Sequence, residues 1–393
     1  MVKDTKKESV LLINNYYSEF GGEDSSFQTE IETLSKKYNV ELLTDKNSKK
    51  ITFFSIISIL FLKNFKANIK LKNILSEKHF KFVVVNNLWF TLSLGVLKIL
   101  EKQNINYYVK LHNFRIDCAN GIHFRNNTIC HSCNEKSAFQ GIKYKCYRNS
   151  YLFSFLITRF SKKFKRFLIM NNVQILCLSN FKKKYLLNLG FKKENISIVS
   201  NQLVEITSKK NLEPSLNFLK NSVFAIYAGR VSEEKGVKES IKLFLKTQNV
   251  LFDFFVVAGD GPELLKLKEI FKNEKQVLFT GQINPIFTKE LISISKLVIL
   301  HSKLYEGQPM LLLEASSNSV PVLTLDNGGL REFFPNDYPL ICSSENEMVE
   351  KFSKINDLDN LKKIGLKNKQ FINEYFSKFS FDKYISEKLN ESK

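Results

Sequence analysis

Apolar residues along the chain gather into short continuous runs, and stretches with apolar positions at helical spacing lie between these runs. In the first half, the runs predict strands at Ser9–Ile13, Phe82–Val85, Tyr107–Leu111 and Gln174–Leu178. Continuous apolar runs are typical of parallel strands that helices cover on both faces. A polar loop with Gly21 and Gly22 follows the first run, and Phe27–Tyr38 has helical spacing. We therefore predict a doubly wound α/β domain over residues 1–200.

The same alternation starts again after a polar segment at residues 201–221, where we place the linker. The second set of runs predicts strands at Val223–Ala228, Phe254–Ala258, Val277–Thr280, Leu297–Leu300 and Val320–Leu325. We expect a second Rossmann-like domain over residues 201–370. The last apolar periodicity, over Phe371–Leu389, predicts a helix, so residues 371–393 are assigned to a separate C-terminal element.

Length and composition narrow the class of protein. A chain of 393 residues is too long for one ordinary hydrophobic core, and its 44% of hydrophobic residues excludes intrinsic disorder. The net charge of +20 is uneven, because residues 51–200 contain 25 Lys and Arg against 5 Asp and Glu. Either this segment faces a polyanion, such as nucleic acid or an anionic membrane surface, or its excess of cations is a solubility bias of a lysine-rich composition.

The N-terminal sequence does not resemble a signal peptide, since residues 1–8 carry mixed charge and the following apolar stretch is short. The longest apolar run, Ile51–Leu62, has 12 residues, whereas a membrane-spanning helix needs about 20. We expect a cytoplasmic protein in which this run forms a buried or surface-seated helix. Its six cysteines are then thiols or metal ligands, and we expect Cys177 and Cys342 to be buried.

Two cations flank the loop after the predicted strand Val223–Ala228. Gly229-Arg230 follows the strand directly, and Lys235-Gly236 comes five residues later. Arginine offers a planar fork and lysine a compact charge, so the pair can hold the two phosphates of a diphosphate. Taken alone, two solvated cations on a surface loop are the simpler interpretation.

The strongest signal is the segment Glu306–Glu314, which follows the predicted strand Leu297–Leu300. We expect Pro309 to be the first helical residue. Backbone N–H groups around Gly307–Met310 and the positive end of the helix dipole then invite an anion. The two glutamates at the ends of the segment can accept hydrogen bonds from sugar diols. No Gly-x-Gly-x-x-Gly follows any predicted strand, so a dinucleotide site has no support.

Three motifs occur in a fixed order: Gly-Arg-x4-Lys-Gly at 229–236, Gly-Asp-Gly-Pro at 259–262 and Glu-x7-Glu at 306–314. The second motif predicts a tight turn into a helix that begins at Pro262. As a set the three motifs resemble the retaining glycosyltransferases of family 4. The resemblance continues through Leu178–Phe181 and Val199–Asn201, so it covers most of the chain. It implies a GT-B fold, in which two Rossmann-like domains face each other across a cleft and a C-terminal helix crosses back to the first domain.

The resemblance also implies roles for individual residues. Arg230 and Lys235 would hold the donor diphosphate, and Glu314 would bind the ribose. His112 and Glu306 would contact the donor sugar at the reaction centre and are the expected catalytic residues. The donor site would be completed by Gly22, Gly307, Gln308, Pro309 and Met310. Gln308 and Asn201-Gln202 depart from the usual family pattern, which leaves the activity intact but the donor choice open.

The first half resembles a subgroup of these enzymes in two further places. Glu23 and Asp24 follow Gly22, where they would orient the acceptor hydroxyl or serve only as a helix cap. Residues 112–148 form an insertion with four cysteines in the pattern Cys-x11-Cys-x2-Cys-x12-Cys. These are Cys118, Cys130, Cys133 and Cys146. The four thiols either form a structural zinc site or pack unliganded in a loop.

The segment Tyr151–Met170 alternates aromatic residues with five cations, namely Arg159, Lys162, Lys163, Lys165 and Arg166. Such a pattern is typical of a basic amphipathic helix that lies on anionic lipid. A core helix with a solvated cationic face fits the pattern equally well.

These observations predict a cytoplasmic glycosyltransferase, peripheral on the inner face of the cell membrane. It would move a hexose or N-acetylhexosamine from a nucleotide-diphosphate sugar to a saccharide or lipid-linked saccharide in cell-surface polysaccharide synthesis. Catalysis would need no cofactor, because Arg230, Lys235 and the helix start would stabilise the leaving diphosphate. The sequence contains no recognisable nucleic-acid-binding module. The alternative is a catalytically silent scaffold that binds nucleotide sugars.

Overall fold

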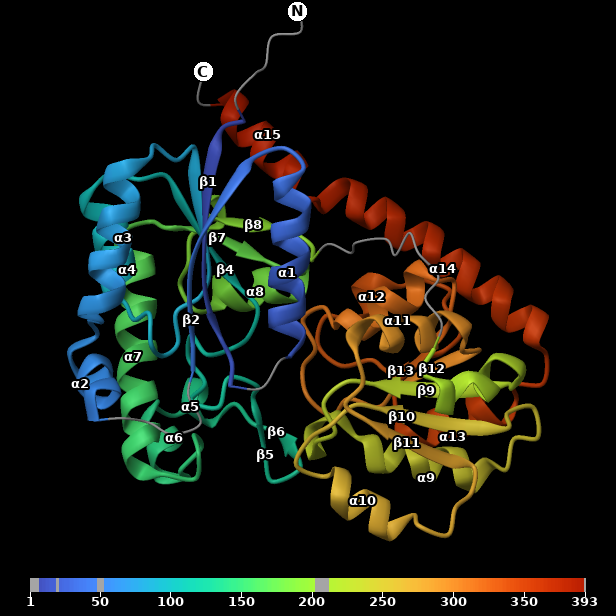
Figure 1. Cartoon of the computed structure of the whole chain (residues 1–393). Coiled ribbons are helices and arrows are strands. Elements are labelled where there is room, and N and C mark those ends of the chain that lie inside the picture. Colours follow the sequence, from blue (N-terminus) through green and yellow to red (C-terminus); the bar gives the residue numbers. More distant parts are fainter. Residues whose placement is uncertain (1–6, 19–20, 48–52, 202–211, 392–393) are drawn as a thin grey trace, which may run out of the picture. The chain divides into compact units, whose positions relative to one another are not determined.

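The computed structural model describes residues 7–18, 21–47, 53–201 and 212–391 (Figure 1). Residues 202–211 of the predicted linker, Gln202 among them, lie outside this description. The chain divides into two compact units, which are described separately below. The first unit comprises residues 1–125 and 130–204, and the second comprises residues 126–129 and 205–393. The predicted strand–helix alternation occurs in both units.

The first unit is built on a six-stranded sheet in which all neighbouring strands are parallel. Its order is β2-β1-β3-β4-β7-β8. The strands are β1 (Ser9–Tyr16), β2 (Asn39–Lys46), β3 (Phe82–Asn87), β4 (Tyr107–Leu111), β7 (Gln174–Cys177) and β8 (Ile196–Ile198). Because β2 and β3 flank β1, the strand order reverses between β1 and β3. In doubly wound sheets ligands bind at the carboxyl ends of the strands beside such a reversal.

Helices cover both faces of this sheet, as the continuous apolar strands predict. Figure 1 shows α3, α4 and α7 on one face and α1 and α8 on the other. The helices are α1 (Gly22–Ser35), α2 (Phe53–Phe61), α3 (Phe65–Glu77), α4 (Gly95–Lys102), α7 (Tyr151–Met170) and α8 (Asn180–Asn188). Leu156, Phe160 and Leu168 of α7 lie in the hydrophobic core. The helix predicted at Ile51–Leu62 is α2, and residues 51 and 52 of that range lie outside the described residues.

The segment between β4 and α7 contains only short elements. These are β5 (Phe124–Arg125), β6 (Thr128–Ile129), α5 (Ser132–Glu135) and α6 (Phe139–Lys143). Residues of α6 pack against α7. All four cysteines of the predicted insertion lie on or beside these elements.

The second unit also has a six-stranded parallel sheet, with the order β11-β10-β9-β12-β13-β14. Its strands are β9 (Phe224–Ala228), β10 (Phe254–Ala258), β11 (Val277–Gly281), β12 (Leu297–Leu300), β13 (Val322–Leu325) and β14 (Ile341–Cys342). This is the 3-2-1-4-5-6 order of dinucleotide-binding domains, and the order reverses between β9 and β12. The prediction of two doubly wound parallel sheets is therefore confirmed.

The helix after β10 and the C-terminal helix do not begin where the sequence predicts. Pro262 does not begin the helix after β10, because that helix starts at Leu264 with Glu263 as its N-cap. The final helix is also not a single element beginning at Phe371, because one helix runs from Leu358 through that residue and a second begins after Ser380. The helices of this unit are α9 (Val237–Thr247), α10 (Leu264–Ile270), α11 (Pro285–Ile294), α12 (Met310–Ser317), α13 (Glu345–Ser353), α14 (Leu358–Phe379) and α15 (Phe381–Glu391).

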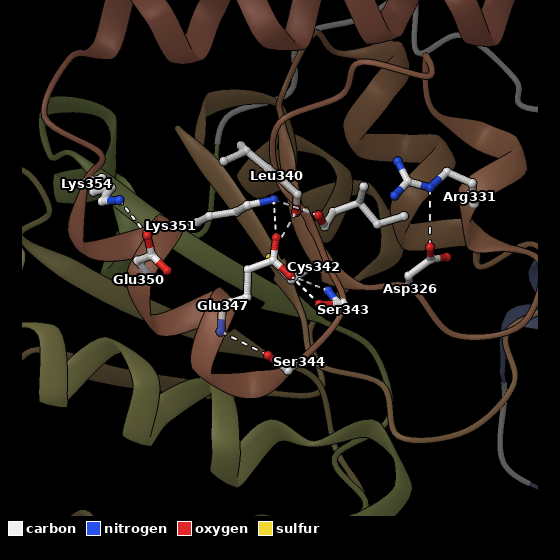
Figure 2. Close-up of polar contacts among 11 residues, drawn as sticks. Asp326, Arg331, Leu340, Cys342, Ser343, Ser344, Glu347, Glu350, Lys351 and Lys354 are labelled. Carbon is white, nitrogen blue, oxygen red and sulfur yellow. Dashed lines mark hydrogen bonds and ion pairs between the residues drawn. The ribbon is translucent and has the colours of Figure 1, made fainter.

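Helix α13 is fixed at its start by a side-chain cap and by contacts to the strand before it (Figure 2). Ser344 Oγ accepts a hydrogen bond from the Glu347 N–H at 3.2 Å, which satisfies one of the unpaired donors of the first turn. The Glu347 carboxylate accepts hydrogen bonds from both Ser343 N–H and Ser343 Oγ. Lys351 Nζ donates to the carbonyl oxygen of Ile341 at 2.9 Å, which ties the helix to β14.

Candidate functional site

The candidate donor site of the second unit lies in the loops that follow β9 and β12. These strands are neighbours on either side of the reversal in strand order, so their carboxyl ends flank the expected ligand position. The loop after β9 contains Arg230 and Lys235, and the loop after β12 contains Glu306 and leads into α12. The fold thus brings Lys235 next to Glu306, which is 71 residues away in the sequence.

A lysine–glutamate ion pair joins these two loops. Lys235 Nζ donates to Glu306 Oε1 at 2.6 Å, and the same oxygen accepts a hydrogen bond from Ser302 Oγ at 2.7 Å. Glu306 is only 6% exposed, whereas the Lys235 side chain is 26% exposed. The carboxylate is therefore anchored inside the protein, and the ammonium group sits where it also reaches solvent. The sequence pattern does not single out Ser302, although this residue lies just beyond the end of β12.

The main chain of Glu306 is held as firmly as its side chain. Glu306 forms an isolated parallel β-bridge with Gly328, and its carbonyl oxygen accepts a hydrogen bond from Gly329 N–H at 2.9 Å. Gly328 has a φ of +70°, and a Cβ atom there would lie 2.8 Å from the Glu306 carbonyl oxygen. Only glycine combines this conformation with so close an approach. Gly328 and Gly329 therefore support the predicted site residue.

The loop that carries Gly328 is closed by further contacts. Asn327 Nδ2 donates to the carbonyl oxygen of Ser302 at 2.6 Å. Arg331 Nε donates to Asp326 Oδ2 at 3.3 Å across the loop, as Figure 2 shows. The loops after β12 and β13 are therefore connected through both main-chain and side-chain hydrogen bonds.

Helix α12 begins one residue later than predicted. Pro309 is its N-cap, with φ −69° and ψ 132°, and Met310 is the first helical residue. The backbone of Pro309 is extended, as is typical of an N-cap residue. Its carbonyl oxygen accepts the first hydrogen bond of the helix, from Leu312 N–H at 3.1 Å. The N–H groups of Met310 and Leu311 belong to the first turn, which has no intrahelical acceptors for them. With this later start, the positive end of the helix dipole still lies directly after Glu306, Gly307 and Gln308.

Glu314 lies in the second turn of α12 and is partly buried. Removal from water raises the pKa of its carboxyl group to about 7, and Lys289 opposes this shift. Among the residues that the structure describes, none forms a hydrogen bond or ion pair with this carboxylate. The group is thus a half-buried acid that a ligand with donor groups would stabilise in its charged form.

Arg230 is exposed at the end of β9, and no ion pair among the described residues involves it. Its carbonyl oxygen accepts a hydrogen bond from the buried Tyr227 hydroxyl at 2.7 Å. Burial raises the pKa of that hydroxyl, and the nearby Glu306 and Glu234 carboxylates raise it further. The guanidinium of Arg230 is therefore available to an anion, while its backbone is held in place by the strand beneath it.

In the first unit, the Gly21–Asp24 segment starts helix α1, and the two acidic residues differ in their surroundings. Asp24 is buried and its Oδ2 accepts a hydrogen bond from Gly21 N–H at 3.1 Å, so it acts as a helix cap. Burial raises its pKa to about 6. Glu23 instead accepts hydrogen bonds from Tyr17 Oη at 2.9 Å and from Asn113 Nδ2 at 3.0 Å. Gly22 is the first residue of the helix.

His112 follows β4 directly, at the carboxyl edge of the first sheet, as predicted. Its Nε2 lies 2.9 Å from Asn86 Oδ1. Burial lowers the pKa of the imidazole well below its ordinary value, and the nearby Lys110 and Lys182 lower it further. Lys182 is itself buried: its ammonium group donates to the Asn113 carbonyl oxygen at 2.6 Å and lies 3.6 Å from the centre of the Phe114 ring. His112 is therefore a neutral imidazole at neutral pH.

The cysteines of the insertion are free thiols. Among the residues that the structure describes, no three His, Cys, Asp or Glu side chains are arranged to hold a metal ion. A zinc site at Cys118, Cys130, Cys133 and Cys146 therefore stays a prediction. Burial raises the pKa of Cys118 to about 11, so this thiol is protonated at neutral pH. Cys177 and Cys342 are buried, which confirms the prediction for both.

Comparisons with known proteins point to one class of enzyme. Residues 208–370 match the family model described as glycosyl transferases group 1. The phosphatidylinositol N-acetylglucosaminyltransferase GPI3 subunit of Saccharomyces cerevisiae is 23% identical over 214 residues, which cover 52% of this chain and 47% of the yeast protein. The O-antigen biosynthesis glycosyltransferase WbnH of Escherichia coli is 26% identical over 184 residues, or 47% of this chain and 50% of that protein. The chain spans about half the length of the curated relatives it matches.

A solved structure matches over nearly the whole chain. The structure of Anabaena Alr3699/HepE in complex with UDP and glucose has a TM-score of 0.63 at 14% identity, and the match covers 98% of this chain and 100% of that one. The likeness at this identity concerns the fold. Residues 208–370 are therefore similar to the glycosyl transferases group 1, in a chain whose two parallel-sheet domains have the GT-B fold that the sequence predicts.

Proposed function

We propose that the chain is a retaining glycosyltransferase of family 4 that transfers a hexose or N-acetylhexosamine from a nucleotide-diphosphate sugar. The observation that carries this proposal is the Lys235–Glu306 pair at the reversal of the second sheet. A buried, doubly anchored carboxylate beside a partly exposed ammonium group offers one acceptor for sugar hydroxyls and one cation for phosphate. The UDP-bound structure with the same fold supports a nucleotide donor.

The described residues of the site would each bind a different part of the donor. Arg230 and Lys235 hold the two phosphates, and the first turn of α12 adds N–H donors and the positive end of its dipole. The leaving diphosphate gains negative charge as the bond to the sugar breaks, so these fixed donors stabilise the transition state more than the ground state. Glu306 binds the sugar and Glu314 the ribose. The reaction needs no metal ion in this scheme, and it proceeds with retention.

On the acceptor side, we propose a saccharide or a lipid-linked saccharide and a role in cell-surface polysaccharide synthesis. One relative is named for transfer to phosphatidylinositol and the other for O-antigen biosynthesis, which supports this class of acceptor. Glu23, which is held by Tyr17 and Asn113, is the group that we assign to the acceptor hydroxyl. Asp24 is occupied as a helix cap and is assigned no such role.

A panel of UDP-, GDP- and ADP-sugars tests the donor. We expect one nucleotide to raise the melting temperature of the chain, because a ligand that binds only the native state stabilises it. Transfer to a lipid-linked acceptor should then fall by about 100-fold in Glu306→Gln, which keeps the shape of the side chain but loses its charge. Glu269→Gln, at an exposed residue of α10, is the matched control and should leave transfer unchanged.

Two results would contradict the proposal. If no nucleotide sugar changes the melting temperature, the loops after β9 and β12 are not a donor site. If a sugar nucleotide binds but the wild-type chain never turns it over, the chain is a nucleotide-sugar-binding scaffold. Nucleic acid is not proposed as a partner.

A further inference from the structure

A chain of polar groups runs through the first unit and ends at His112. Lys110 Nζ lies 3.8 Å from Glu30 Oε1, and both residues are at least nine-tenths buried. Glu30 Oε2 accepts a hydrogen bond from Asn86 Nδ2 at 2.9 Å. Asn86 Oδ1 then lies 2.9 Å from His112 Nε2. Three elements contribute to the chain: α1 supplies the glutamate, β3 the asparagine, and β4 with the residue after it the lysine and the histidine.

The chemistry of these groups fixes their orientation. An ionised carboxylate can only accept hydrogen bonds, so Asn86 must turn its NH2 group toward Glu30. The amide oxygen of Asn86 then faces His112, and an amide oxygen can only accept. His112 Nε2 must therefore carry the proton. In a neutral imidazole the other nitrogen, Nδ1, is then the hydrogen-bond acceptor.

Burial makes this arrangement costly to reverse. If Asn86 turned around, its oxygen would face the Glu30 carboxylate, and two buried acceptors without a proton between them would repel each other. Lys110 balances the charge of Glu30, since its ammonium group lies 3.8 Å from the carboxylate. The low pKa of His112, caused by burial, Lys110 and Lys182, agrees with a neutral ring.

We propose that Glu30 and Asn86 are positioning residues that hold His112 as the Nε2–H tautomer and so present Nδ1 as an acceptor to a hydroxyl group of the bound sugar. The last step rests on the proposed function and on the contact between His112 and the donor sugar that the family resemblance implies. The tautomer itself follows from the contacts among Glu30, Asn86 and His112 and is independent of any ligand. A sugar that lacks the hydroxyl would lose this contact, so the chain of residues contributes to donor specificity.

Nitrogen-15 NMR of the histidine rings tests the tautomer in the full-length protein. The signals of His112 are identified by their loss in His112→Gln. In the wild type we expect Nε2 to carry the proton and Nδ1 to be unprotonated. In Glu30→Gln the new amide can donate to Asn86 Oδ1, so Asn86 is free to turn and the two tautomers of His112 should mix. Glu32→Gln changes an exposed glutamate of the same helix and should leave the signals unchanged.

A charge-conserving double variant provides the rescue. In Glu30→Gln with Asn86→Asp, the negative charge moves from position 30 to position 86. The new carboxylate accepts from both the new amide at position 30 and His112 Nε2, so the Nε2–H tautomer should return. A wild-type protein with the proton on Nδ1, or a Glu30→Gln variant with the same tautomer as the wild type, would overturn the proposal. The wild-type measurement needs no variant, so a variant that fails to fold does not remove the test.

Kinetics separates this inference from the proposed function. We expect kcat/KM for the donor to fall about 10-fold in Glu30→Gln and to recover in the double variant, because one hydrogen bond to a sugar hydroxyl is lost and restored. A donor analogue without the contacted hydroxyl should show no difference between wild type and variant. If the tautomer changes as expected but no donor is turned over, the positioning role stands and the proposed function fails. If turnover is normal and the tautomer does not respond to Glu30→Gln, the positioning role fails alone.

Discussion

Glu314 has a carboxyl group whose charge opposes folding. Its pKa in the folded chain is about 7, because burial disfavours the charged form, and its ordinary value is 4.5. At pH values between 4.5 and about 7 the Glu314 carboxyl group is largely protonated in the folded state and largely ionised in the unfolded state. The stabilising effect of this bound proton is present at low pH, and the free energy of unfolding decreases as the pH rises through 7. We expect Glu314→Gln to raise the free energy of unfolding at pH 8 by about 2 kcal/mol, after allowance for the solvent that reaches the side chain.

Chemical denaturation at pH 5 and pH 8 measures this effect. At pH 5 the wild type and Glu314→Gln should differ little in their free energy of unfolding, because the Glu314 carboxyl group is largely protonated in the folded wild type. The same substitution should weaken UDP binding, since the neutral amide accepts fewer hydrogen bonds from a ribose diol. A variant that is equally stable relative to wild type at both pH values would show that Glu314 is not a buried acid.

At the scale of elements, the turn between the short helix at Glu233–Lys235 and α9 depends on one glycine. Gly236 has a φ of +64°, and a Cβ atom there would lie 2.0 Å from the carbonyl oxygen of His301. The turn therefore places Lys235 next to the loop after β12 through a backbone contact that leaves no room for a side chain. We expect Gly236→Ala to lower the free energy of unfolding by at least about 3 kcal/mol, because strain and collision add.

Gly281 is a matched control in the same unit. Its φ is +69°, but no atom lies within 4 Å of a Cβ placed there. Gly281→Ala should therefore cost only the left-handed conformation, about 1–2 kcal/mol. Urea denaturation compares the two variants. Equal losses would mean that the contact with His301 contributes nothing and that the position of Lys235 does not depend on it.

The elements that can be predicted from the sequence are those whose surroundings make them apolar throughout. Strands β4, β10 and β12 have the predicted bounds, because buried central strands are continuous apolar runs. The apolar pattern does not reveal β2, β8 and β14. β2 lies at a sheet edge and mixes polar with apolar residues, and β8 and β14 are edge strands of three and two residues. Helix α14 begins at Leu358, well before the predicted Phe371. The apolar pattern does not reveal its first half, because few positions there are apolar.

The candidate site shows the same division. Glu306 and Lys235 can be predicted because each belongs to a short motif with a turn or a helix start beside it. Gly328 and Asn86 support site residues through contacts between segments that are distant in the sequence or on different elements. Such contacts depend on the register of neighbouring strands and on side-chain packing. The spacing of residues along the sequence predicts neither the register nor the packing.

At the scale of the whole molecule, the first unit has an exposed face on α7 that combines apolar residues with cations. The exposed face of α7 begins with Leu152 and Phe155 and continues with Arg159, Lys162, Lys163 and Arg166. Arg159 lies against the main chain of Leu60, and the neighbouring Phe61 is 70% exposed. The opposite face of α7 belongs to the core, so the cations lie outside. Among the described helices, none has the length and apolar character to cross a bilayer.

We expect replacement of these four cations of α7 by glutamine to weaken binding to vesicles rich in phosphatidylserine by at least about 100-fold, since each contributes about 1 kcal/mol near such a surface. Vesicle sedimentation at low and physiological salt measures the loss. The control replaces Lys242, Lys246, Lys266 and Lys268, which are four exposed lysines of α9 and α10 in the second unit. Equal losses in the two variants would show that only net charge matters and that the α7 face is no docking surface.

The anchoring of Glu306 has a practical consequence for engineering. Its described partners, from Lys235 and Ser302 to Gly328 and Gly329, all belong to the second unit. The contacts that hold this carboxylate are thus contained in one contiguous stretch of the gene. Hybrid proteins should inherit the anchored Glu306 together with that stretch, and attempts to transplant the glutamate motif alone would leave its supports behind.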